Sequence, residues 1–128
     1  VLATEAMGAD FAYIGSAFIA TEEANANDGY KQGIVRGSAE EIVYTNLFTG
    51  VHGSYLRGSI ENAGLDPDQL PEGEKASMDF GSSDAKAWRD IWGCGQGIGA
   101  IDAVLPTADC VASLEREYLA AKQRLLAV

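Results

Sequence analysis

The sequence has little histidine, cysteine and proline: among its 128 residues there are one histidine, two cysteines and three prolines. A zinc site made of cysteine and histidine therefore cannot be assembled, and Cys94 and Cys110 have no second pair with which to build a disulfide framework. We expect both to be buried, reduced thiols. No uncharged run reaches the ~20 residues of a membrane-spanning helix, and no signal peptide is visible. These absences predict a cytoplasmic protein with no metal and no membrane partner.

Basic residues are also scarce. Nine Lys and Arg stand against 19 Asp and Glu, which gives a formal net charge of −10. Proteins that bind nucleic acids or anionic membranes use Lys and Arg to do so, and the charge therefore excludes both partners. The apolar share of 47% excludes a disordered chain. The length suffices for one domain that buries roughly two-thirds of its unfolded surface.

Glycine, by contrast, is abundant, with 15 residues, which suggests loops that approach something closely. The first 37 residues are typical of an α/β unit. A helix is expected to end at Gly8, and the apolar run Phe11–Ile14 predicts a strand buried on both faces. After a turn at Gly15 and Ser16, a helix capped by Thr21 is expected to continue to about residue 36.

The rest of the chain is expected to alternate short elements with loops. The pattern predicts a strand at 42–45, a glycine-punctuated loop at 48–55, a short helix at 56–63, a surface loop at 66–83, a short helix at 84–92 and a glycine-rich loop at 93–99. The final helix begins at Pro106, and its apolar residues recur at steps of three and four: Val111, Leu114, Tyr118, Ala121, Leu125 and Val128.

The turn at Gly15 and Ser16 is the first candidate site. At the carboxyl end of a parallel strand, free backbone N–H groups and a hydroxyl can hold an anion, and barrels of eight βα units commonly bind a phosphate in this way. An ordinary tight turn is the alternative.

Two other glycine-rich places could carry chemistry. The loop 93–99 lacks the spacing of a dinucleotide-binding loop, because Ile98 stands where the last glycine would be needed. It remains either a loop that approaches a flat ligand, with Gln96 donating and accepting, or a plain connector. His52 lies between Gly50 and Gly53 and could hold a substrate oxygen or relay a proton, or it could be incidental.

Three separated stretches, in the expected order, resemble the nitronate monooxygenase (2-nitropropane dioxygenase) family. They are GADFAYIGSAFIATEEANANDGYKQ, IVYTNLFTGVHGSYLRGSI and WRDIWGCGQGIGAI. The first is similar to the family pattern GAD-x-V-x-x-G-T-x-F-x-A-T-x-E, with Ser16 keeping the hydroxyl of the threonine. The family consists of FMN-dependent (β/α)₈ barrels, to which flavin-type enoyl-acyl-carrier-protein reductases and some NADH:quinone reductases are similar.

The resemblance implies an α/β fold: the carboxyl-terminal portion of a (β/α)₈ TIM barrel, followed by a mostly helical extension. Residues 1–37 would be the last βα unit and residues 38–128 the extension. Because a complete barrel takes about 250 residues, Val1 is expected to mark a cut inside it.

The resemblance also implies FMN as cofactor and assigns site residues. Gly15 and Ser16 would meet the FMN phosphate, Gly95 and Gln96 would lie near the flavin, and His52 is assigned to substrate binding as a hypothesis. No catalytic residue is expected within this chain, because the family's catalytic histidine lies upstream of the matched residues.

The activity implied by the resemblance is oxidation of a nitronate or a similar small substrate with oxygen as acceptor. The alternative within the class is an NAD(P)H-dependent flavin reductase acting on an enoyl thioester, an acyl-CoA or a quinone. A different class is a non-catalytic barrel fragment that needs a partner. A homodimer of the intact enzyme is a further expectation.

Overall fold

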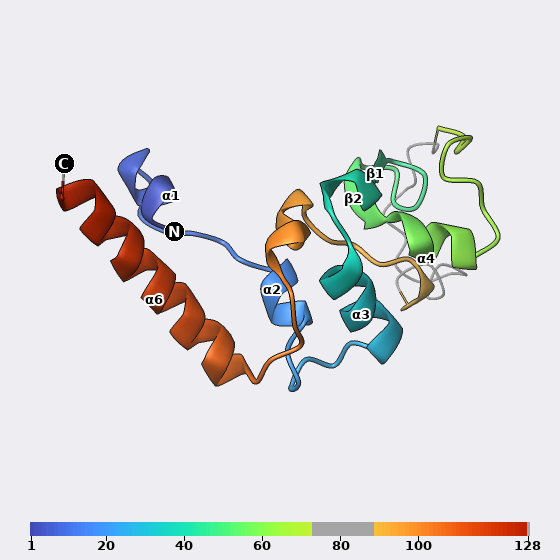
Figure 1. Ribbon diagram of the computed structural model, residues 1–128. Helices are drawn as coiled ribbons and strands as arrows, with labels where there is room; N and C mark the ends of the chain where they lie inside the picture. The colour runs from blue at the N-terminus through green and yellow to red at the C-terminus, as the bar shows by residue number, and fades with distance from the viewer. Residues whose placement is uncertain (73–88, 128) are drawn as a thin grey trace.

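The computed structural model describes residues 1–72 and 89–127. Most of the loop predicted at 66–83 and of the helix predicted at 84–92 lies outside the described residues. In chain order the elements are α1 (Leu2–Ala6), α2 (Ser16–Ile19), α3 (Asp28–Arg36), the 3₁₀ turn η1 (Ala39–Glu41), β1 (Ile42–Thr45), β2 (Gly53–Leu56), α4 (Arg57–Asn62), the 3₁₀ turn η2 (Gln96–Ala100) and α6 (Thr107–Leu126). Figure 1 shows α1 beside α6 at one end, the strands with α3 and α4 at the other, and α2 with η2 between them.

The strands β1 and β2 form an antiparallel pair in which Ile42 lies opposite Leu56. The predicted strand at 42–45 is confirmed, but β2 occupies the end of the predicted loop and the first residue of the predicted helix at 56–63. The segment around Gly93 lies along the other edge of β2, where the Leu56 N–H donates to the Trp92 carbonyl at 2.8 Å. This segment therefore leads directly from the sheet to η2.

Ser59 fastens α4 to the same segment. Its side chain is fully buried, its hydroxyl donates to the Leu56 carbonyl at 2.7 Å, and it accepts from the Trp92 N–H at 3.0 Å. One serine thus joins the start of α4, the end of β2 and the chain that leads to η2.

The hydrophobic core consists of two clusters. The first lies between α3, β2 and η2 and is built on Ala20, Ile34, Leu56, Cys94 and Ile98. The second lies between β2 and α4 and is built on Tyr55, Ile60 and Ile91. Both cysteines are free and buried, as predicted.

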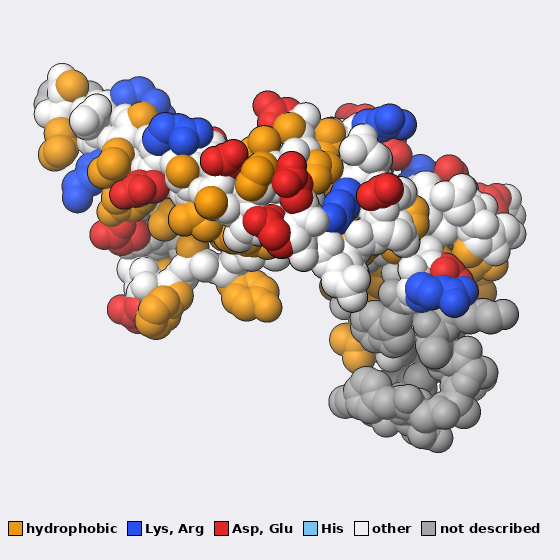
Figure 2. All heavy atoms as spheres, turned by 90° about the horizontal axis from the view of Figure 1, so that it is seen from below, with side chains coloured by type: hydrophobic (Ala, Val, Ile, Leu, Met, Phe, Trp, Pro, Cys, Tyr) orange, Lys and Arg blue, Asp and Glu red, His pale blue; other side chains and the backbone are white. Residues whose placement is uncertain are grey.

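The strand predicted at Phe11–Ile14 is wrong for this chain. The segment has no regular secondary structure and pairs with no strand of the part that the structure describes. Phe11 is 91% exposed and Tyr13 103% exposed. Figure 2 shows that hydrophobic side chains are also present on the surface of the molecule seen from below. A strand of a parallel sheet takes its hydrogen bonds from neighbouring strands, and residues 1–72 and 89–127 supply none here.

The helix predicted from Thr21 begins later. Thr21 forms a parallel bridge with Leu105 and donates its hydroxyl to the Phe18 carbonyl at 2.8 Å. The N-cap of α3 is Asn27, whose side chain accepts from the backbone of Tyr30 at 2.8 Å. Asparagine is a stronger N-cap than threonine, and with Thr21 paired to Leu105 the N-cap lies six residues later, at Asn27. The helix then ends at Arg36, as predicted.

Helix α6 begins directly after Pro106, as predicted, and its first turn is capped by a distant residue. The Glu23 carboxylate accepts from both the backbone N–H and the hydroxyl of Thr107, at 2.8 and 2.7 Å. These hydrogen bonds hold the pKa of Glu23 below its ordinary value. The C-terminal half of α6 is joined to α1, because the Tyr118 hydroxyl donates to Glu5 at 2.6 Å.

The apolar stripe predicted on α6 is only partly covered. Leu114, Tyr118 and Ala121 are half-buried, whereas Val111 and Leu125 are exposed. Val128, the last residue of the predicted stripe, lies outside the described residues. None of the helices that the structure describes is long and apolar enough to cross a membrane.

Candidate functional site

The structure brings together residues from the two glycine-containing turns that the sequence singled out. The Gly95 N–H donates to the Ser16 hydroxyl oxygen at 2.9 Å, although 79 residues separate them. Gly15 is the N-cap of α2, and Gly95 directly precedes η2. The N-terminal ends of α2 and η2 therefore lie next to each other.

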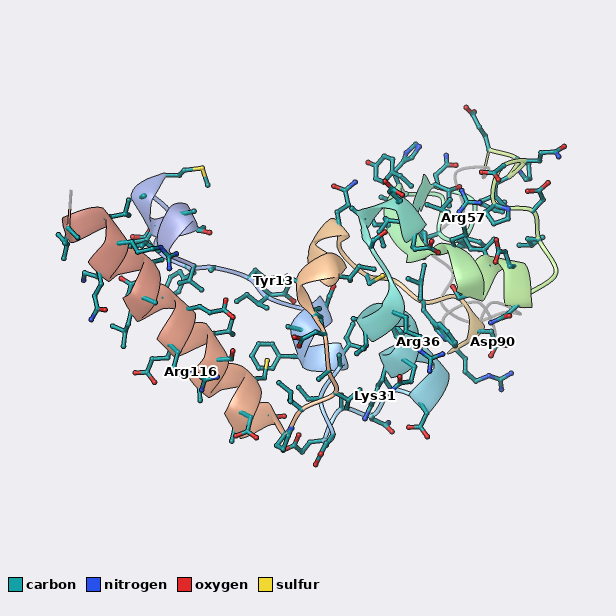
Figure 3. The ribbon with its side chains drawn as sticks, in the orientation of Figure 1. Tyr13, Lys31, Arg36, Arg57, Asp90 and Arg116 are labelled. Atoms are coloured by element: carbon teal, nitrogen blue, oxygen red, sulfur yellow. The ribbon has the colours of Figure 1, made fainter. Side chains whose placement is uncertain are left out.

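A cleft of about 480 Å³ opens beside this contact. Its walls come from residues 13–17, the glycines around η2, the connector to α6 and one face of α6. Tyr13, labelled in Figure 3, belongs to the link between α1 and α2 and lines the cleft. A Cβ atom added at Gly15 or Gly97 would meet nothing within 4 Å, so the backbone is open at both positions.

The donors at this cleft suit an anion. Gly15 is the N-cap of α2, and Ser16 and Ala17 are its first two residues. Their three backbone N–H groups donate to no acceptor among residues 1–72 and 89–127. The Ser16 hydroxyl receives the Gly95 N–H, which leaves its own proton available to a ligand. Backbone N–H groups at a helix start together with a hydroxyl are the donor set that holds a phosphate.

Charge makes one end of the cleft unfavourable for an anion. Asp102 and Glu117 lie among its lining residues, and the described lining includes no Lys or Arg. Two carboxylates repel an anion near α6. A phosphate is therefore best placed at the start of α2, where the N–H groups lie.

The two other predicted site residues lie elsewhere. Gln96 is exposed at the start of η2, next to Gly95 but not among the residues that line the cleft. His52 is stacked on Tyr44, with ring centroids 5.0 Å apart, and lines a separate hollow of about 240 Å³. The structure thus brings Gly15, Ser16 and Gly95 together and leaves His52 apart.

Sequence reasoning missed the contribution of α6 to the cleft. Cys110, Ser113 and Glu117 line it, and the Ser113 hydroxyl donates to Glu117 at 3.4 Å. These residues recur at steps of three and four, which identifies one helix face but does not tell what the face meets.

The buried thiol next to this site is chemically quiet. Burial raises the pKa of Cys94 to about 11, so the thiol is neutral at physiological pH and is not a nucleophile. Its part is packing in the first core cluster.

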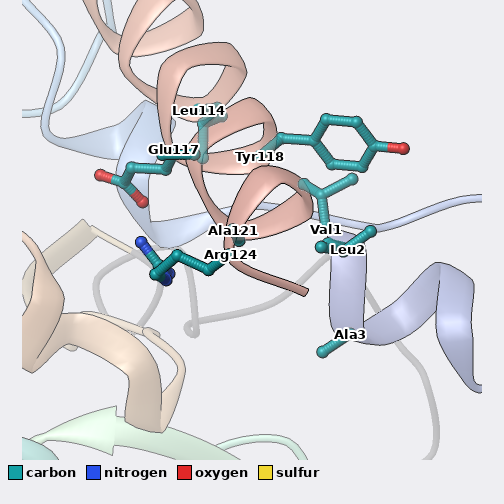
Figure 4. Close-up of a pocket in the computed structure, with 9 residues that line it drawn as sticks. Val1, Leu2, Ala3, Leu114, Glu117, Tyr118, Ala121 and Arg124 are labelled. Atoms are coloured by element: carbon teal, nitrogen blue, oxygen red, sulfur yellow. The ribbon is translucent and has the colours of Figure 1, made fainter. Parts of the chain in front are cut away.

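A second hollow lies between α1 and α6 (Figure 4). Leu2, Leu114, Tyr118 and Arg124 are among the residues that line it. It contains none of the residues predicted to bind cofactor or substrate.

The cleft has donors that suit an anion, and solved structures show the fold of which it is a part. A FabK mutant from Thermotoga maritima aligns with a TM-score of 0.68 at 22% identity, covering 98% of this chain and 40% of its own. Another FabK structure from the same organism aligns with a TM-score of 0.66 at 21% identity, covering 98% of this chain and 42% of its own. The chain therefore has the fold of part of a TIM barrel protein.

The sequence comparison gives the more particular relationship. A curated nitronate monooxygenase from Paraburkholderia phytofirmans is 30% identical over 126 residues, which cover 91% of this chain and 34% of the relative. The resemblance to this FMN-dependent family is thereby confirmed. No family model matches the chain. The chain spans about a third of the length of the curated relative it matches.

Proposed function

We propose that the protein carrying this chain is an FMN-dependent oxidoreductase that oxidises a nitronate or a similar small substrate, with oxygen as the electron acceptor. The observation that carries the proposal is the contact between Ser16 and Gly95 at an open cleft with unused donors. The likeness to a nitronate monooxygenase supports it. When bound, FMN supplies the redox chemistry by taking electrons from substrate and passing them to oxygen.

The residues of this chain would hold the phosphate end of the cofactor. The N–H groups of Gly15, Ser16 and Ala17 would donate to phosphate oxygens, as would the Ser16 hydroxyl. Because Gly95 already donates to the Ser16 oxygen, the hydroxyl proton is free to be donated to the ligand. Gln96 would offer its amide to the flavin edge.

His52 is proposed as a substrate contact in its own hollow beside Tyr44. A cytoplasmic location and a homodimer of the intact enzyme complete the proposal.

Flavin binding tests the proposal directly. The protein in its natural length should purify yellow, with FMN that is released on denaturation. Ser16→Ala should raise the dissociation constant for FMN about tenfold or more, because a hydrogen bond to a charged group contributes about 1.5–3 kcal/mol. Ser16→Thr keeps the hydroxyl and is the matched control. A colourless protein that takes up no FMN would refute the proposal.

The likeness to the FabK structures favours a second candidate, an NAD(P)H-dependent flavin reductase of an enoyl thioester, an acyl-CoA or a quinone. Oxygen uptake that depends on a nitronate, without NADH, supports the first candidate. Oxidation of NADH that depends on an enoyl thioester or a quinone supports the second.

The exposure of Phe11 and Tyr13 favours a third candidate, a non-catalytic fragment that needs a partner. Size-exclusion chromatography of the 128-residue chain tests it. Aggregation that a complementary partner relieves supports the fragment, and a compact monomer contradicts it.

A further inference from the structure

We propose that helix α3 positions the loop at Gly95 for the cofactor, and that Tyr30 is the positioning residue. The inference rests on the proposed function, because the placement of Gly95 affects FMN only if the cleft beside Ser16 holds its phosphate. Tyr30 itself is not among the residues that line the cleft.

Trp92 lies against α3 on a surface that glycine leaves open. Its ring is stacked on Tyr30, with centroids 5.4 Å apart and planes inclined by 10°. A Cβ atom on Gly29 would lie 3.0 Å from the Trp92 ring. A Cβ atom on Gly33 would lie 2.5 Å from Leu56 and 3.7 Å from the Trp92 ring. A larger residue at Gly29 would press on the indole, and one at Gly33 would force the Leu56 side chain to move.

Tyr30 also holds the backbone that follows Trp92. Its hydroxyl donates to the carbonyl of Gly93, two residues before Gly95. Burial raises the pKa of Tyr30 to about 12, so the hydroxyl keeps its proton at physiological pH and remains a donor. From Gly93 the chain continues through the buried Cys94 to Gly95, whose N–H reaches Ser16. The tyrosine therefore fixes the chain immediately upstream of the proposed cofactor contact.

This arrangement explains why α3 contains glycine inside a helix, where it is the least favourable residue apart from proline. The space that each glycine leaves is filled by the indole or by Leu56. Gly58 in α4 is different, because a Cβ atom there would meet nothing within 4 Å. The chain thus offers a matched glycine that lies in a helix but does not face Trp92.

The experiment uses the protein in its natural length with three variants. Tyr30→Phe removes the hydroxyl and keeps the ring, Gly29→Ala presses on Trp92, and Gly58→Ala is the control. Hydrogen exchange of the Gly95 amide is measured without FMN, and the dissociation constant for FMN is measured by quenching of flavin fluorescence. Thermal unfolding shows whether each variant is folded.

Tyr30→Phe and Gly29→Ala should both speed exchange at Gly95 and raise the dissociation constant about tenfold, the equivalent of about one hydrogen bond. Gly58→Ala should change neither. If Tyr30→Phe does not fold, Gly29→Ala provides the same two readouts.

The two readouts separate the possible failures. Unchanged exchange at Gly95 in both variants overturns the positioning role. Faster exchange with unchanged FMN affinity also overturns it and leaves the proposed function standing. If the unmutated protein binds no FMN, the proposed function fails, and the inference fails with it.

Discussion

Replacing Ser59 with alanine tests how the loop leading to Gly95 is held. In the native fold the Ser59 oxygen accepts from the Trp92 N–H at 3.0 Å and its hydroxyl donates to Leu56 at 2.7 Å, and the side chain is 0% exposed. Alanine removes both hydrogen bonds and leaves the Trp92 N–H without its acceptor. An unsatisfied buried donor costs about 1–3 kcal/mol and a lost hydrogen bond about 1 kcal/mol. Alanine deletes the hydroxyl and adds no new group that could pack in its place.

We therefore expect Ser59→Ala to lower the free energy of unfolding by about 2 kcal/mol, a large share of the roughly 5–15 kcal/mol of a folded domain. Urea unfolding measures the loss, and hydrogen exchange at the Trp92 amide locates it. Ser113→Ala is the control, since its hydroxyl makes a single exposed hydrogen bond at 3.4 Å and surface changes stay within about 0.5 kcal/mol. A loss no larger than that of the control would show that Ser59 does not hold the segment.

Three further predictions concern other contacts. The lowered pKa of Glu23 means that its contribution to stability is complete above its ordinary pKa of 4.5 and is lost as the pH falls through the lowered value. The start of α6 should therefore fray in acid, and Glu23→Gln should abolish this pH dependence. Amide exchange near Thr107 measures the fraying. Tyr118→Phe removes the hydrogen bond to Glu5, so proteolysis within residues 2–6 should become faster while the core is unaffected; equal cleavage rates would contradict this. Cys94 should resist alkylation at pH 8 until the protein unfolds, because its pKa is about 11; rapid labelling of the folded protein would show that the thiol is accessible.

The sequence predicted the elements whose signals are local. The strand at Ile42–Thr45 and the start of α6 after Pro106 follow from apolar runs and turn residues next to them. The ends of α1 and α4 were also found, because Gly8 and Gly64 adopt positive φ values of 91° and 81°, which favour glycine.

The elements that were missed depend on distant residues. Thr21 is a good N-cap by type, yet it pairs with Leu105, which lies far along the chain. Phe11–Ile14 has the composition of a buried strand, but composition does not supply the neighbouring strands that make one. At Thr21 a contact with a distant residue is present, and at Phe11–Ile14 the contacts with neighbouring strands are missing from the part that the structure describes. Neither can be predicted from the local sequence.

The candidate site was predictable only in part for the same reason. The glycine and hydroxyl at Gly15 and Ser16 are visible in the sequence, and so is the glycine at 95. That they meet, and that His52 lies in another hollow, depends on how α2 and η2 pack. The resemblance to a known family supplied the assignment of Gly95 that local patterns left open.

The pairing of Thr21 with Leu105 bears on how this protein can change. The Glu22 N–H donates to the Leu105 carbonyl at 2.9 Å, and the Leu105 N–H donates to Ala20 at 3.4 Å. The two ends of the stretch from residue 22 to residue 104 are therefore held next to each other by these hydrogen bonds. Since the entropy of closing a loop grows slowly with its length, the loops within this stretch can gain or lose residues at little cost, whereas the elements that carry the two core clusters cannot. Whatever varies there, α2 and the start of α6 remain side by side.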